Sequence, residues 1–79
     1  MLDTFEVSIP AYRETVLNVW KYNLQNNVNA YPFSPTSDVL NRIAIQPYDF
    51  VFIDGAKSEY GSYLRNVYPF LAHKSIIII

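Results

Sequence analysis

The chain has 79 residues, of which none is cysteine and only one, His73, is histidine. The absence of cysteine excludes disulfides and thiolate metal sites within these residues, and one histidine cannot form a histidine-rich metal site. Glycine occurs only at Gly55 and Gly61. A phosphate-cradling loop, which needs several closely spaced glycines, is therefore missing from the sequence.

The sequence also lacks a strong excess of positive or negative charge, and it has no long apolar run. The net charge is −1, and lysine and arginine form no cluster, so we expect no DNA partner and no generic phosphate-binding surface. The isoleucine run at residues 76–79 is far too short to span a membrane. The first residues lack the basic segment and apolar core of a secretory signal. We therefore expect a cytoplasmic protein with no membrane partner.

Aromatic residues, by contrast, are abundant. The chain contains seven tyrosines, five phenylalanines and one tryptophan, and 51% of its residues are hydrophobic. This composition is typical of a folded globular chain and not of a disordered one. Its length is enough for one small domain, so a single domain over residues 1–79 is expected.

The spacing of apolar residues predicts strands that alternate with helices, beginning and ending with a strand. This order, β-α-β-α-β-α-β, is typical of a parallel α/β sheet with right-handed crossover connections. The predicted strands cover residues 2–7, 28–33, 50–53 and 75–79, and the predicted helices cover residues 9–25, 39–43 and 58–71.

Local signals predict where these helices begin and end. Ser8 suits the N-cap of the first helix, and Asn26–Asn27 is expected to end it. Ser34 or Ser37 is expected to cap the short second helix, and Pro69 should bend or end the last turn of the third. Four aromatic residues at helical spacing are expected to pack in the core: Tyr12, Trp20, Tyr60 and Tyr68.

The most informative stretch is Tyr48–Lys57, where an apolar run ends abruptly in an acid, a glycine and then a lysine. A buried parallel strand delivers polar side chains in this way to the carboxyl edge of an α/β sheet, where such folds bind ligands. Asp54 and Lys57 could both point into one crevice there. Alternatively, Asp54 caps the following helix and Lys57 is solvated.

These residues resemble the catechol-type, metal-dependent O-methyltransferases, which are class I enzymes that use S-adenosylmethionine. Tyr48–Lys57 is similar to the fourth strand of the family and its Asp-x-x-Lys turn, and Thr4-Phe5-Glu6 is similar to the end of its second strand. The resemblance implies that Glu6 holds the cofactor ribose, that Asp54 is a metal ligand and that Lys57 is the catalytic base. A carboxylate suits a diol because it accepts two hydrogen bonds at once. Glu6 could instead be a solvated acid at the helix entry.

The sequence also departs from the family pattern. The glycine-rich cofactor loop would lie before Met1, and an Asp-Asn pair that completes the metal site would lie after Ile79. Ser34-Pro35-Thr36 stands where the family has Gly-Asp-Ala near the adenine. We therefore expect a truncated, partial Rossmann-like methyltransferase domain that lacks the first strand and the C-terminal strands. In the family the first strand lies between the second and fourth, so its absence would leave an empty slot about one strand wide, with the flanking strands roughly 9–10 Å apart.

Two functions are consistent with this reading. The first is S-adenosylmethionine-dependent methyl transfer, with a divalent metal such as Mg²⁺, to the hydroxyl of a small molecule or of a hydroxylated tRNA base. The isolated 79 residues are then expected to be inactive, because most of the cofactor site is missing. The alternative is a non-catalytic α/β interaction module that pairs its open strands with another protein or with itself.

Overall fold

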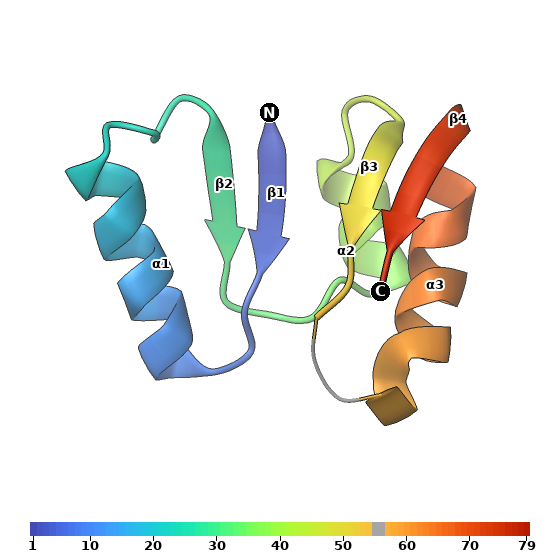
Figure 1. Cartoon of the computed structure of the whole chain (residues 1–79), viewed down its shortest axis with the longest axis horizontal. Coiled ribbons are helices and arrows are strands. Elements are labelled where there is room, and N and C mark those ends of the chain that lie inside the picture. Colours follow the sequence, from blue (N-terminus) through green and yellow to red (C-terminus); the bar gives the residue numbers. More distant parts are fainter. Residues whose placement is uncertain (55–56) are drawn as a thin grey trace. The chain divides into compact units, whose positions relative to one another are not determined.

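The computed structural model describes residues 1–54 and 57–79 and, at Lys57, the backbone only. These residues form two compact units, Met1–Ser34 and Pro35–Ile79, and each is described by itself. Each unit holds one sheet of two parallel strands with its helices (Figure 1). The expected α/β class and the parallel pairing of the strands are confirmed.

The first unit is a single β-α-β element. Strand β1 covers Leu2–Phe5, helix α1 covers Ile9–Lys21, and strand β2 covers Val28–Tyr31. The two strands pair in parallel over their whole length. One further hydrogen bond, from the Glu6 N–H to the Tyr31 carbonyl at 3.0 Å, extends this ladder past the end of β1.

Helix α1 ends earlier than expected because of Asn23. Asn23 has φ = 59°, the left-handed conformation that asparagine tolerates better than most residues. Its N–H donates to the Trp20 carbonyl at 3.1 Å, and the Leu24 N–H donates to the Val19 carbonyl at 2.8 Å. This pair of bonds is a Schellman motif, which satisfies carbonyls at the helix end. The predicted stop at Asn26–Asn27 is therefore wrong by about one turn.

The first unit buries little apolar surface. Helix α1 packs against β2, and Tyr12, Val16 and Val19 on this side are half-buried. Trp20 is 65% exposed, so the expectation that it packs in the core is wrong. None of the described side chains of this unit is fully buried. Its stability therefore depends on the partial burial of several large side chains.

The second unit contains two helices and two strands. Helix α2 covers Ser37–Ile43, strand β3 Tyr48–Phe52, helix α3 Tyr60–Val67 and strand β4 Leu71–Ile78. Short 3-10 turns, Lys57–Glu59 and Tyr68–Phe70, flank α3.

The end of α3 follows from proline chemistry. Pro69 cannot donate the hydrogen bond that an α-helix needs at that position, so the chain passes through a 3-10 turn and enters β4 at Leu71. The predicted early end of this helix is confirmed. The last strand begins four residues before the predicted Ser75, and Tyr68 is 75% exposed instead of packed in the core.

The core of the second unit consists of one residue from each of three segments. Leu40 of α2, Ile53 directly after β3 and Val67 of α3 are buried. Thr36 fixes the start of α2, because its hydroxyl accepts a hydrogen bond from the Val39 N–H at 3.3 Å. The prediction that Ser34 or Ser37 caps this helix is therefore wrong.

Each sheet contains only two strands among the residues that the structure describes. In β3, the Ile53 N–H points to β4, where it donates to the Ile78 carbonyl at 2.9 Å. Because backbone groups alternate along a strand, the Phe52 N–H points to the opposite, open edge. No described helix is long and apolar enough to cross a membrane.

Leu40→Ala should strongly destabilise the second unit. Leu40 is only 1% exposed, and replacing a buried leucine with alanine costs about 2–5 kcal/mol through lost burial and the cavity left behind. The matched control is Ile45→Ala, because Ile45 is 94% exposed and its replacement should change the free energy of unfolding by less than about 0.5 kcal/mol. Urea denaturation followed by circular dichroism measures both. Equal effects of the two substitutions would contradict this core.

Candidate functional site

Glu6 directly follows β1, at the carboxyl end of the first parallel ladder. Its backbone is fixed by the bond from its N–H to the Tyr31 carbonyl, and its side chain is half-buried. No described group hydrogen-bonds to its carboxylate. Glu6 therefore lies at the end of a parallel pair where open α/β sheets bind ligands, with both carboxylate oxygens able to accept hydrogen bonds.

Asp54 lies at the carboxyl end of the second parallel ladder, one residue beyond Ile53, which holds the place equivalent to Glu6. It follows the buried Ile53, whose N–H bonds to β4, so the chain is held in the ladder up to the residue before it. Asp54 itself is exposed. An apolar strand therefore delivers this carboxylate to the carboxyl end of the second sheet, as its sequence position predicts.

Lys57 begins the 3-10 turn that precedes α3. The side chain of Lys57 and residues 55–56 lie outside the described residues. The prediction that Asp54 and Lys57 point into one crevice therefore lies outside them as well. Glu6 belongs to the first unit, whereas Asp54 and Lys57 belong to the second. Asp54 and Lys57 lie on the same connection, between β3 and α3 of the second unit.

A complete metal site is not found at Asp54. The described part of the chain contains no group of three or more histidine, cysteine, aspartate or glutamate side chains that could hold a metal ion. A divalent cation bound by protein alone needs several oxygen ligands. Asp54 alone does not meet this requirement, so the expected Mg²⁺ does not fit the described residues.

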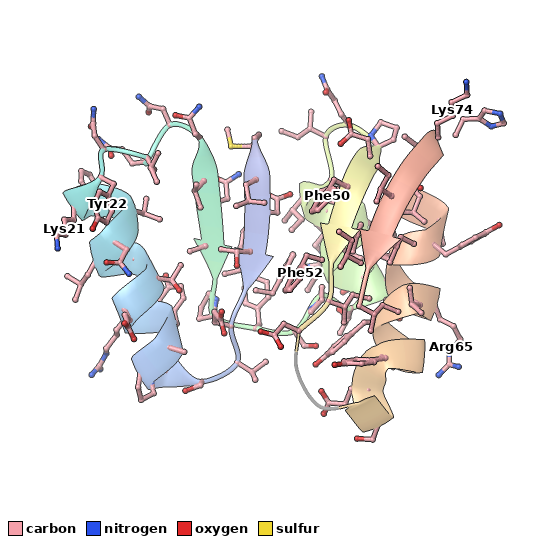
Figure 2. The ribbon with its side chains drawn as sticks, in the orientation of Figure 1. Lys21, Tyr22, Phe50, Phe52, Arg65 and Lys74 are labelled. Carbon is pink, nitrogen blue, oxygen red and sulfur yellow. The ribbon has the colours of Figure 1, made fainter. Side chains whose placement is uncertain are left out.

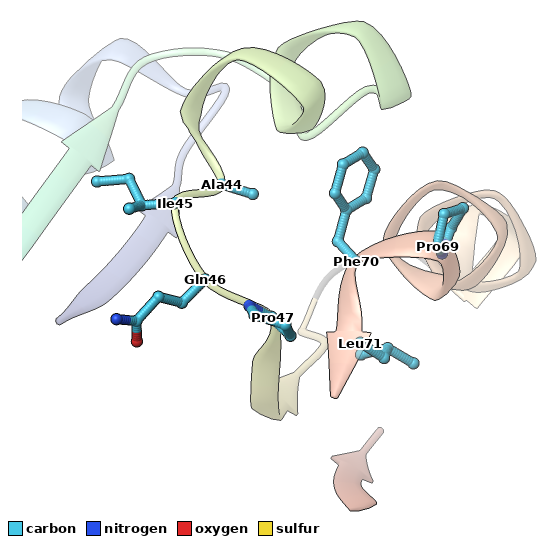
Figure 3. Close-up of a pocket in the computed structure, with 7 residues that line it drawn as sticks. All are labelled: Ala44, Ile45, Gln46, Pro47, Pro69, Phe70 and Leu71. Atoms are coloured by element: carbon cyan, nitrogen blue, oxygen red, sulfur yellow. The ribbon is translucent and has the colours of Figure 1, made fainter. Parts of the chain in front are cut away.

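The hollows of the second unit lie at the opposite ends of its strands. One of about 210 Å³ is lined by residues just before β3 and around the start of β4 (Figure 3). It is smaller than the roughly 300–1,000 Å³ of typical small-molecule pockets. Its lining residues are Ala44, Ile45, Gln46, Pro47, Pro69, Phe70 and Leu71.

A second, wider depression of about 650 Å³ results from an irregularity in β4 that the sequence did not suggest. Between the pairs Tyr48↔Leu71 and Phe50↔Ile76, β4 carries three more residues than β3. Such bulges redirect side chains, and here His73 and Lys74 are exposed beside the depression. His73 was expected at the surface before the last strand; the structure places it within that strand.

An aromatic cluster lies next to Glu6 in the first unit. The ring of Phe5 stacks on the ring of Tyr31 with centroids 5.2 Å apart, and Phe33 lies 5.5 Å from Tyr31. Burial raises the pKa of the Tyr31 phenol, and the negative charge of Asp3 raises it further. These rings therefore pack at the carboxyl end of the β1–β2 ladder, next to Glu6 in the sequence.

No protein-family model matches the chain, and no curated protein matches it. The methyltransferase resemblance therefore rests on the residues of the chain alone.

The raised pKa of Tyr31 predicts that the first unit loses stability at alkaline pH. An unfolded tyrosine ionises near pH 10, whereas the folded phenol keeps its proton to a higher pH. Above about pH 10 the unfolded state therefore binds fewer protons than the folded state, and stability falls as pH rises through the raised pKa. Denaturation at a series of pH values should show a smaller alkaline loss for Tyr31→Phe than for the unmodified chain.

The matched control is Tyr22→Phe, because Tyr22 is exposed. This substitution should leave the alkaline loss of stability unchanged. An equal reduction in both variants would contradict a specific effect of Tyr31.

Proposed function

We propose that these 79 residues are part of a class I S-adenosylmethionine-dependent O-methyltransferase domain and do not themselves include the central strand of its sheet. The observation that carries this proposal is the placement of the two acids. Glu6 directly follows β1 and Asp54 lies two residues after β3, each at the carboxyl end of a parallel pair, β1 with β2 and β3 with β4.

In this proposal Glu6 binds the ribose of the cofactor. A carboxylate accepts hydrogen bonds from both hydroxyls of a diol, and half-burial strengthens those bonds by excluding water. The end of β1 is fixed by its ladder, so the Glu6 backbone is held in place before the cofactor arrives. The cofactor supplies the methyl group that is transferred to the acceptor hydroxyl.

In the same proposal Asp54 and Lys57 act on the acceptor side. A lysine amine can take the proton of an attacking hydroxyl when its pKa is matched to the reaction. Asp54 is one of several ligands that a metal site of this family needs. Because the described residues do not supply the others, no catalytic step of these 79 residues is assigned to a metal. The acceptor class, a small hydroxyl compound or a hydroxylated tRNA base, remains a proposal.

The 79 residues alone should not bind S-adenosylmethionine at sub-millimolar concentrations. Without the glycine-rich turn, no backbone N–H groups approach the methionine part of the cofactor. Isothermal titration calorimetry with S-adenosylmethionine, with and without Mg²⁺, measures this. Sub-millimolar binding by a purified monomer would overturn the expected inactivity.

Adding the missing element gives a positive test of the same proposal. A synthetic peptide with an apolar strand followed by a glycine-rich turn should confer cofactor binding on the chain. Glu6→Gln should weaken this binding by about tenfold or more, the loss expected when a charged partner is removed. Glu14→Gln, an exposed position on α1, should not. A peptide that confers no binding, or equal effects of the two variants, would contradict the proposal.

The second candidate is an interaction module, and the two-stranded sheets favour it. Parallel strands are normally paired on both edges, so an extended segment of another protein could add to the open edge of β1 or β3. Such a partner would protect the Phe52 N–H from hydrogen exchange without any need for S-adenosylmethionine. Protection that appears only together with cofactor binding would favour the methyltransferase instead.

A further inference from the structure

Strand β4 presents a free backbone edge along its isoleucine run. It pairs with β3 on one side, and among the described residues no strand pairs with its other side (Figure 1). The Ile53 N–H donates to the Ile78 carbonyl, so the backbone groups of Ile78 point to β3. Because these groups alternate along a strand, the N–H and carbonyl of Ile77 point away from β3. A further strand can therefore bond to this edge at Ile77.

The first half of β4 is protected from edge pairing, whereas the isoleucine run is not. The bulge before Ile76 disrupts the ladder, and bulges bend a strand edge away from possible partners. Lys74 lies within this bulge and is exposed near the start of β4 (Figure 2), and a lysine charge also discourages a neighbouring strand. From Ile76 to Ile78 the register is regular, and residues 76–79 contain no charge and no proline.

The side chains of the run show which strand fits beside it. Ile76, Ile77 and Ile78 are 62%, 37% and 44% exposed, and they alternate between the two faces of the strand, so each face is partly open. Exposed, uncharged segments of β-branched residues are the ones that pair edge to edge with identical segments. A run of identical residues matches itself, because every isoleucine then lies beside an isoleucine of the other strand. The chain therefore supplies its own partner for this edge.

We propose that the isoleucine run of β4 pairs with the same run of a second copy, as an antiparallel ladder centred on Ile77. A two-fold axis perpendicular to the sheet brings this edge to itself, and strands related in this way are antiparallel. The two Ile77 residues are then directly opposite and exchange both N–H···O bonds. Ile76 of one copy lies opposite Ile78 of the other, with Cα atoms about 4.5 Å apart.

The pairing ends at a dimer because β4 has only one free edge. Its other edge is occupied by β3, so the two β3–β4 sheets join into one continuous sheet with β4 of each copy at its centre. The contact consists of a short ladder and a few isoleucine pairs, which is typical of a weak association. We therefore expect the dimer only at high protein concentration.

This inference is independent of the proposed function, since the contact involves no cofactor. Sedimentation equilibrium of the full chain up to about 1 mM, with a metal chelator and without S-adenosylmethionine, should show a monomer that dimerises as concentration rises. Ile77→Pro should weaken the dimer by about tenfold or more, because it removes the N–H that faces the partner and no donor to β3. Phe52→Pro makes the same change at the open edge of β3 and should leave dimerisation unchanged.

Paired charges test the direction and register of the strands. Ile76→Lys should weaken the dimer about tenfold, because a charge replaces an apolar contact at the edge. Adding Ile78→Glu should restore much of the binding, since the new lysine of each copy then lies opposite the new glutamate of the other. Leu17→Lys, at a similarly exposed position on α1, should have no effect. A double variant no stronger than Ile76→Lys alone would overturn the antiparallel register.

Hydrogen exchange of the unmodified chain tests the same contact without any substitution. Exchange at the Ile77 amide should slow as protein concentration rises, whereas exchange at the Phe52 amide should stay fast. A chain that stays monomeric over the whole range would overturn the proposal. Concentration-dependent protection of Phe52 in place of Ile77 would also overturn it, because the edge of β3 would then form the contact. Growth into assemblies larger than a dimer would overturn the closed two-fold pair.

Discussion

The backbone of a parallel strand has hydrogen-bonding groups on both of its edges, and in this chain each sheet satisfies only one edge of each strand. The described residues form two separate parallel pairs, β1 with β2 and β3 with β4. Within a pair the ladder is regular enough to position the residue that follows the strand, as at Glu6. Among the described residues, no strand pairs with the other edges of β1 and β3. This constraint governs both the stability of the chain and what it can bind.

Incomplete pairing also explains why so much apolar surface is exposed. A parallel sheet is normally covered on both faces, and its strands are correspondingly apolar throughout. Residues 50–53 have this composition, yet Phe50 and Phe52 are 54% and 63% exposed whereas Ile53 is buried. The proposed methyltransferase function addresses one part of this deficit, because it needs a strand at an open edge.

The order and type of the elements could be predicted because they depend on local apolar spacing. The ends of elements were harder to predict where several similar residues compete. Asn23, not Asn26–Asn27, ends α1, because only Asn23 lies where the Schellman bonds can close. Thr36, not its serine neighbours, caps α2 for the same geometric reason.

The site could be predicted only in part. That Glu6 and Asp54 end up at the carboxyl ends of strands follows from the apolar runs before them. Their placement relative to each other depends on contacts distant in sequence, about which a local pattern says nothing. The bulge of β4 around His73 likewise has no periodic signal. The exposure of Trp20 reflects how little surface the first unit offers for burial against α1.

The most direct test of the central claim is residue-resolved hydrogen exchange of strand β3 by nuclear magnetic resonance. Neighbouring amides of one strand serve as test and control, because the Ile53 N–H bonds to the Ile78 carbonyl and the Phe52 N–H points to the open edge. We expect slow exchange at Ile53 and fast exchange at Phe52 in the isolated chain. Equal protection of the two amides would contradict an unpaired edge.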